Sequence, residues 1–170
     1  MERLIQGGEQ LGAQIAGLPF SAMLRASAWA YPAIEIVHLA GMALLFGSIV
    51  VVDLRLAGMG RQLPVTVLLR HALPLSLIGF GAIAVSGVLL FMAHADELIV
   101  NRAFLAKVVL VGLGLANAAW FHLGPYRRLR QAGGAWETGR APPAGARACA
   151  LGSLTIWVLV ICAGRLIAYM

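Results

Sequence analysis

Four long runs of apolar residues dominate this sequence and limit what it can fold into. They cover about residues 33–52, 72–93, 103–123 and 148–169. A helix of about 20 residues crosses the ~30 Å hydrocarbon core of a bilayer. None of the runs alternates apolar with polar residues as the strands of a membrane barrel do. We therefore predict an all-α fold, a polytopic membrane four-helix bundle formed by residues 29–170.

The overall composition supports burial in lipid. The chain is 61% hydrophobic and 12% charged, with a mean hydropathy of +0.86, whereas a soluble domain has about 25% charged residues. The net charge of +6 resides mainly in the short connections between apolar runs. We therefore expect the lipid bilayer to be the partner of these bases, and no nucleic acid. Cys149 and Cys162 lie about 20 Å apart along one run and cannot pair with each other, so we expect both to be small buried apolar residues.

Residues 1–28 have a different character from the four runs. Their apolar residues recur at mixed spacings that fit an amphipathic helix lying at the membrane interface, namely Leu4, Leu11, Ile15 and Leu18. Pro19 should end this helix. Trp29 and Tyr31 follow, as is typical of the headgroup level. We predict an interfacial amphipathic segment ahead of the transmembrane domain.

The connections predict an orientation. Connections 54–71 and 124–147 hold three and five arginines, whereas the opposite side has three bases and five acids. By the positive-inside rule, we expect these two connections in the cytoplasm and both termini outside it, in the cytoplasmic (inner) membrane of a bacterium. Pro64 and Pro74 fit a helix start after the first connection. Segment 131–147 lacks apolar periodicity and has the composition of a flexible connection.

All four histidines lie in or at the ends of the apolar runs. His38 and His94 fall on one side of the membrane, and His71 and His122 fall on the other. Such pairs could bind haem b as axial ligands, with His38 and His94 as the first metal-binding pair. His71 and His94 are roughly 35 Å apart on one helix, which places two haems far from each other. The alternative is that these histidines lie at the membrane interface with one ring nitrogen in contact with water.

The small residues in the runs have two interpretations. Gly41 follows His38 by three residues and Ala118 precedes His122 by four, so both could clear space for a flat ring. The alternative is close helix packing through glycine, which the many glycines of these runs favour.

Other polar residues join the histidines in two groups. Near the outer side are three ionisable residues, Glu35, Lys107 and Arg165, which could hold haem propionates, bind an anion or line a pathway. They could equally form a structural network. The inner group comprises Asp53, Arg55 and Asn117. We expect Asp53 with Arg55 to anchor the exit of the first helix, and Asn117 to hydrogen-bond across helices.

Several stretches carry a resemblance to a known family. They are Trp29–Gly41, Leu44–Leu56, Gly87–Phe91, Phe104–Lys107 and Asn117–His122. In these stretches the chain resembles an uncharacterised family of small bacterial four-helix membrane proteins. The pattern Phe-x-x-Lys followed by Asn is also similar, more distantly, to the membrane domain of copper-resistance proteins of the CopD type. The first resemblance implies the fold without an activity, and the second implies copper handling.

The absence of common catalytic and nucleotide-binding motifs limits the possible functions. The sequence contains no Walker loop, no Cys-x-x-Cys, no His-Glu-x-x-His and no Gly-x-Ser-x-Gly motif. Three hypotheses remain: a redox protein with haem or a metal, a module that transports copper or another small solute, and a non-catalytic membrane subunit. The last implies association with copies of itself or with a membrane complex.

Overall fold

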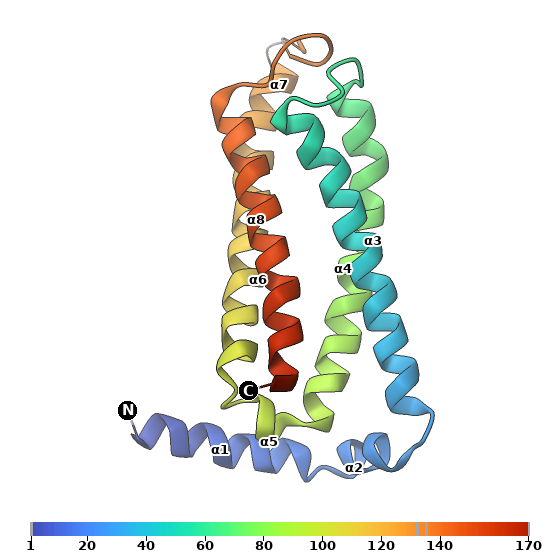
Figure 1. Cartoon of the computed structure of the whole chain (residues 1–170), viewed down its shortest axis with the longest axis vertical. Coiled ribbons are helices and arrows are strands. Elements are labelled where there is room, and N and C mark those ends of the chain that lie inside the picture. Colours follow the sequence, from blue (N-terminus) through green and yellow to red (C-terminus); the bar gives the residue numbers. More distant parts are fainter. Residues whose placement is uncertain (1, 132, 135, 170) are drawn as a thin grey trace.

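The computed structural model describes residues 2–131, 133, 134 and 136–169, with side chains from residue 6 onward. Four long helices run side by side (Figure 1), and the described residues contain no strand. These helices are α3 (Ala30–Ala57), α4 (Val65–Ala93), α6 (Arg102–Phe121) and α8 (Ala144–Leu166). Each is apolar and long enough to cross a membrane, so the predicted all-α bundle of four spans is confirmed.

The helices extend beyond the predicted spans. α3 has 28 residues and α4 has 29, which correspond to about 42 Å at 1.5 Å per residue. That exceeds the ~30 Å of hydrocarbon, so the helix ends reach the headgroup level or the helices tilt. The prediction that Pro74 marks a helix start is wrong. α4 begins at Val65 after Pro64, and Pro74 lies inside the helix, where membrane helices tolerate the lost backbone hydrogen bond.

The bundle consists of two helix pairs. α3 packs along α4, α6 packs along α8, and the pairs meet through α3 and α8. We call the end with connections 58–64 and 132–143 the loop end, and the end near the C-terminus the terminal end (Figure 1). Among the described residues, α4 and α6 make no contact comparable to these. The order around the bundle is therefore α4, α3, α8, α6.

Glycine sets the closest approach of α3 to α4. A Cβ atom on Gly79 would lie 2.7 Å from the Leu45 nitrogen, and one on Gly41 would lie 3.0 Å from the Gly79 carbonyl oxygen. The close packing expected of these glycines is thus confirmed. The alternative, that Gly41 clears space for a flat ring, is wrong because the backbone of α4 fills that space.

Two short helices lie across the terminal end (Figure 1). They are α1 (Glu2–Ala16) and α2 (Pro19–Ala26), separated by the predicted break before Pro19. The Arg25 guanidinium donates to the carbonyl oxygens of Ala93 (2.7 Å) and Ala16 (2.8 Å). It thereby caps the C-terminal ends of α4 and α1 together. α1 also packs on the one-turn helix α5 (Ala95–Leu98).

The apolar residues of this N-terminal pair face outward in part. Leu11, Phe20 and Met23 are exposed large hydrophobic side chains. An outward apolar surface on helices that lie across the bundle fits the predicted interfacial segment. The side chain of Leu4 lies outside the described residues.

The loop end is closed by packed side chains. Trp136 is only 9% exposed and lies in a core cluster with Leu56, Val65 and Leu129. The expectation of a merely flexible connection over 131–147 is therefore wrong for its described part. The Glu137 carbonyl oxygen accepts from the Val65 nitrogen at 3.2 Å, which ties this connection to the start of α4. A single tryptophan among glycines and prolines supplies the apolar surface that holds it.

Candidate functional site: a cavity between the four spans

A cavity of about 180 Å³ lies in the loop-end half of the bundle, and all four spans line it. Apolar residues form most of its wall, including Leu45, Phe80, Phe121 and Trp157. Six polar residues also line it, namely Asp53, Ser76, Asn117, His122, Cys149 and Ser153. The site therefore combines an apolar body with a few polar groups, the usual pattern of a small-molecule site.

Asp53 of α3 is the one acidic residue of this wall. Its side chain is only 6% exposed, and its Oδ2 atom has no hydrogen-bond partner within the described part of the protein. Ser153 of α8 is close enough to interact with the carboxyl group. Burying a carboxyl group in a membrane span without a full set of hydrogen-bond partners costs free energy. Such a group is by default a functional candidate.

His122 presents a second unpartnered atom. Its Nδ1 atom lies 2.8 Å from the Ala118 carbonyl oxygen, which makes Nδ1 the protonated nitrogen. Nε2 then carries a lone pair, and it is buried without a partner among the residues described. The rings of Phe121 and Tyr126 pack edge-on to the imidazole on two sides. The ring is thus held with one acceptor nitrogen away from water.

The backbone at His122 is irregular. A π-helical turn runs over His122–Tyr126 and contains Pro125. Pro125 has no N–H to donate to the preceding turn. Such single π turns inside longer helices occur frequently at functional sites. After this turn the helix continues as α7 (Arg127–Gln131).

Asn117 lies one turn before His122. Its side-chain nitrogen donates to the Cys149 carbonyl oxygen of α8 at 2.9 Å, which is the cross-helix bond that the sequence predicted. Cys149 is buried, but Cys162 is exposed. The expectation of two buried cysteines is therefore wrong for Cys162, because its face of α8 turns away from the other helices.

Arg55 lies outside the cavity, two residues beyond Asp53. Its guanidinium donates to the carbonyl oxygens of Leu63 (2.8 Å), Glu137 (2.9 Å) and Arg61 (3.3 Å). The arginine therefore joins both loop-end connections to the end of α3. Asp53 takes no part in this anchor and lines the cavity instead, because residues two apart point to different sides of a helix.

The predicted outer group is less tightly assembled. His38 Nδ1 lies 2.9 Å from the Ser86 hydroxyl oxygen of α4. Lys107 of α6 is half-buried against α8, with Nζ 3.4 Å from where a Cβ of Gly164 would stand, and it interacts electrostatically with His38. These residues bring α3, α4 and α6 to one level of the terminal half.

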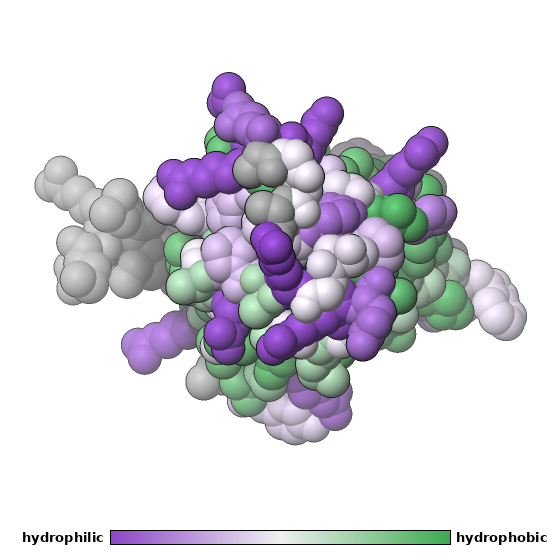
Figure 2. Space-filling model, turned by 90° about the horizontal axis from the view of Figure 1, so that it is seen from above, coloured by the Kyte–Doolittle hydropathy of each residue, from purple (hydrophilic) through white to green (hydrophobic). Residues whose placement is uncertain are grey.

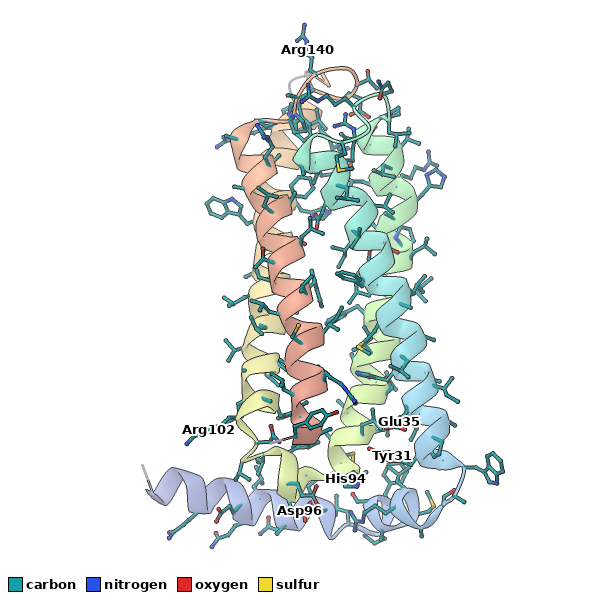
Figure 3. The ribbon with its side chains drawn as sticks, viewed as in Figure 1. Tyr31, Glu35, His94, Asp96, Arg102 and Arg140 are labelled. Carbon is teal, nitrogen blue, oxygen red and sulfur yellow. The ribbon has the colours of Figure 1, made fainter. Side chains whose placement is uncertain are left out.

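The other members of that group point elsewhere. Arg165 donates to the Tyr169 hydroxyl at 2.8 Å and lies 5.1 Å from that ring. Glu35 is exposed on α3, and His94 packs edge-on against Tyr31, with ring centroids 5.3 Å apart. Figure 3 shows Tyr31, Glu35 and His94 together near the terminal end.

The structure places the four histidines against different partners. His38 of α3 bonds Ser86 of α4, and His94 follows the end of α4, eight residues after Ser86, or about 12 Å along the helix axis. His71 is exposed and bonds its own helix through Val67, outside the cavity that His122 lines. Within the described ranges, no group of three or more His, Cys, Asp or Glu side chains could hold a metal ion.

Sequence reasoning did not single out most of the cavity wall, including Ser153, Ser76 and Trp157. Ser153 and Ser76 are polar residues inside apolar runs, and this was the available signal. The sequence did not mark Trp157 as a cavity residue, because a tryptophan in a membrane span can face either lipid or protein.

These features define a class of protein: a multi-pass membrane protein whose four spans form one helical bundle. Within that class, the chain belongs to a family of unknown function, DUF6644, which it matches over residues 28–170. The match begins after α2, so the N-terminal helix pair lies outside the matched range. No functionally curated protein and no solved structure matches the chain significantly.

Proposed function

We propose that this protein binds a small molecule from the bilayer in the cavity between its four spans. The observation that carries the proposal is the pair of buried, unpartnered acceptor atoms, Asp53 Oδ2 and His122 Nε2, in the wall of one cavity. Burying each of these atoms without a partner costs free energy, and a leucine at the same position would avoid that cost. A bound molecule that bonds to them offsets this cost.

Access from the lipid supports the same proposal. Leu73, Leu77 and Leu115 line the cavity, and their side chains are 40%, 62% and 46% exposed. They belong to α4 and α6, the two spans that do not pack closely against each other. A molecule dissolved in the bilayer would enter between these helices.

The haem and copper hypotheses receive less support from the geometry. His38 bonds Ser86, His94 packs against Tyr31, and His71 is exposed outside the cavity, so no observed contact between histidines supports haem b. The metal-handling hypothesis needs a cluster of ligands that the described residues do not offer. An absorption spectrum and metal analysis of purified protein would test both directly. A purely structural membrane subunit is the alternative if no ligand binds.

We also propose an orientation. Hydrophilic side chains gather over the loop end (Figure 2). The exposed arginines of this end are Arg61, Arg70, Arg127, Arg128, Arg130, Arg140 and Arg147. The positive-inside rule places this end in the cytoplasm, and the resemblance described above favours a bacterial inner membrane. The N-terminal helix pair would then lie on the outer surface.

The binding proposal can be tested with a pair of substitutions. The hydroxyl groups of Ser76 and Thr155 both donate to their own helix, but only Ser76 lines the cavity, while Thr155 is exposed. Wild-type protein in lipid nanodiscs should broaden the fluorine NMR signal of 4-fluorobenzyl alcohol, which has a hydroxyl donor, beyond empty nanodiscs. Ser76→Phe should abolish this extra broadening, and Thr155→Phe should retain it. Equal broadening by both variants would overturn the proposal.

A further inference from the structure

The polar groups of the cavity restrict the chemistry of its ligand. Asp53 Oδ2 and His122 Nε2 both accept hydrogen bonds and lack partners in the described chain. The Asn117 amide nitrogen, which could donate, already bonds the Cys149 carbonyl oxygen. The unmet need is therefore for donors, and a ligand that brought only acceptors would leave both atoms unpaired.

The charge of the cavity wall restricts the class of ligand further. A carboxyl group within a membrane span is stabilised as its anion by a nearby positive charge. Arg55, the nearest arginine in sequence, directs Nε and Nη2 to the carbonyl oxygens of the loop end, and its buried Nη1 has no hydrogen-bond partner in the described chain, Asp53 included. The described cavity wall contains no lysine or arginine. A cationic ligand would supply the missing charge.

We propose that the ligand is a small lipophilic amine, bound as its ammonium ion between Asp53 and His122. An ammonium group has several N–H donors and one positive charge, which match a carboxylate and an imidazole acceptor. The proposal rests on the proposed binding function and specifies its ligand class. It differs from a metal site, which would need more ligands than these two residues provide.

The apolar wall fits the rest of such a molecule. The cavity volume of about 180 Å³ corresponds to roughly six water molecules, which is room for about six to nine non-hydrogen atoms. Phe80, Phe121 and Trp157 contribute aromatic rings to the wall. These rings favour an aromatic or aliphatic body and can also stabilise a cation near their faces.

The test compares three probes of nearly equal shape, 4-fluorobenzylamine, 4-fluorobenzyl alcohol and 4-fluorotoluene, by fluorine NMR in nanodiscs. Wild-type protein should bind the amine at least about tenfold more tightly than the toluene, as expected of a hydrogen bond to a charged group. Asp53→Asn should remove this preference. Glu35→Gln, an exposed acid on the same helix, serves as the control and should retain it.

The possible results separate the two proposals. If all three probes bind wild type equally, or if Asp53→Asn keeps the preference for the amine, the amine proposal is overturned and the cavity remains a binding site. If no probe binds wild type, both proposals fail. If Asp53→Asn does not fold, the affinities of the amine and the alcohol for wild-type protein provide the test. Equal affinities would contradict a charged partner for the carboxylate.

Discussion

The side-chain amide of Asn117 in α6 donates a hydrogen bond to the Cys149 carbonyl oxygen in α8, across 2.9 Å. This bond joins the two helices beside the cavity. It also fixes the position of His122, which lies just over one turn further along the third span. It is a bond between a side chain and a backbone carbonyl, so it constrains the helices themselves. Its strength can be measured by substitution.

Replacing Asn117 with leucine should lower the stability of the bundle by about 0.5–1.5 kcal/mol, the range for hydrogen bonds between membrane helices. Leucine has a similar size and cannot form the hydrogen bond. Unfolding by sodium dodecyl sulfate in mixed micelles would measure the change. Thr155→Val should have little effect, because Thr155 bonds only its own helix on an exposed face. Equal losses in both variants would contradict the role given to Asn117.

Gly79 and Gly81 provide a second comparison within α4. Gly79→Ala should destabilise the protein by about 1–3 kcal/mol, the usual cost of overpacking, because the new Cβ would stand 2.7 Å from the Leu45 nitrogen. Gly81→Ala should be neutral or slightly stabilising, since nothing lies within 4 Å of its Cβ position. The same unfolding assay applies. A stable Gly79→Ala variant would mean that α3 and α4 are less closely packed.

Arg55 should be critical for closure of the loop end. Arg55→Met removes three hydrogen bonds to backbone carbonyls, with an expected loss of about 2–4 kcal/mol. Hydrogen exchange should accelerate at the amides of Val65 and Gly139, which bond the Glu137 and Arg61 carbonyl oxygens.

The matched control for that variant is Arg70→Met. Arg70 is an exposed arginine of the same end, so its replacement should leave exchange at both amides unchanged. Slow exchange in Arg55→Met would show that Trp136 and its apolar neighbours close the loop end without the arginine.

Orientation can be tested with single cysteines in a background where Cys149 and Cys162 are serine. Gly7 has open space around it and Thr138 is exposed. In intact cells, a membrane-impermeant maleimide should label Gly7→Cys and should reach Thr138→Cys only after permeabilisation. The reverse pattern would place the arginine-rich end outside the cytoplasm.

The sequence predicted the features that depend on length and on local chemistry. The four spans follow from run length, and the break before Pro19 follows from its fixed φ angle. The Asn117 bond follows from the cost of an unpaired amide in lipid. Each of these consequences holds whichever helices become neighbours.

The arrangement of the site could not be predicted in the same way. In lipid, both the outward and the inward face of a span are apolar, so hydropathy does not reveal which side meets another helix. His71 and His122 therefore appeared to form a pair, although His71 faces outward. Asp53 and Arg55 appeared to act together, whereas one lines the cavity and the other holds the loops.

The π-helical turn at His122–Tyr126 makes the third span sensitive to the number of its residues. Ala103, Gly114 and Phe121 are buried at separations of 11 and 7 residues, close to whole α-helical turns. Seven more residues lead to Arg128, which is exposed, yet the buried residue is Leu129, at 0% exposure. The wider turn absorbs the extra residue. Deleting one residue from this turn would leave Leu129 seven residues after Phe121, the same spacing as from Gly114 to Phe121, so this segment should tolerate a one-residue deletion better than an insertion.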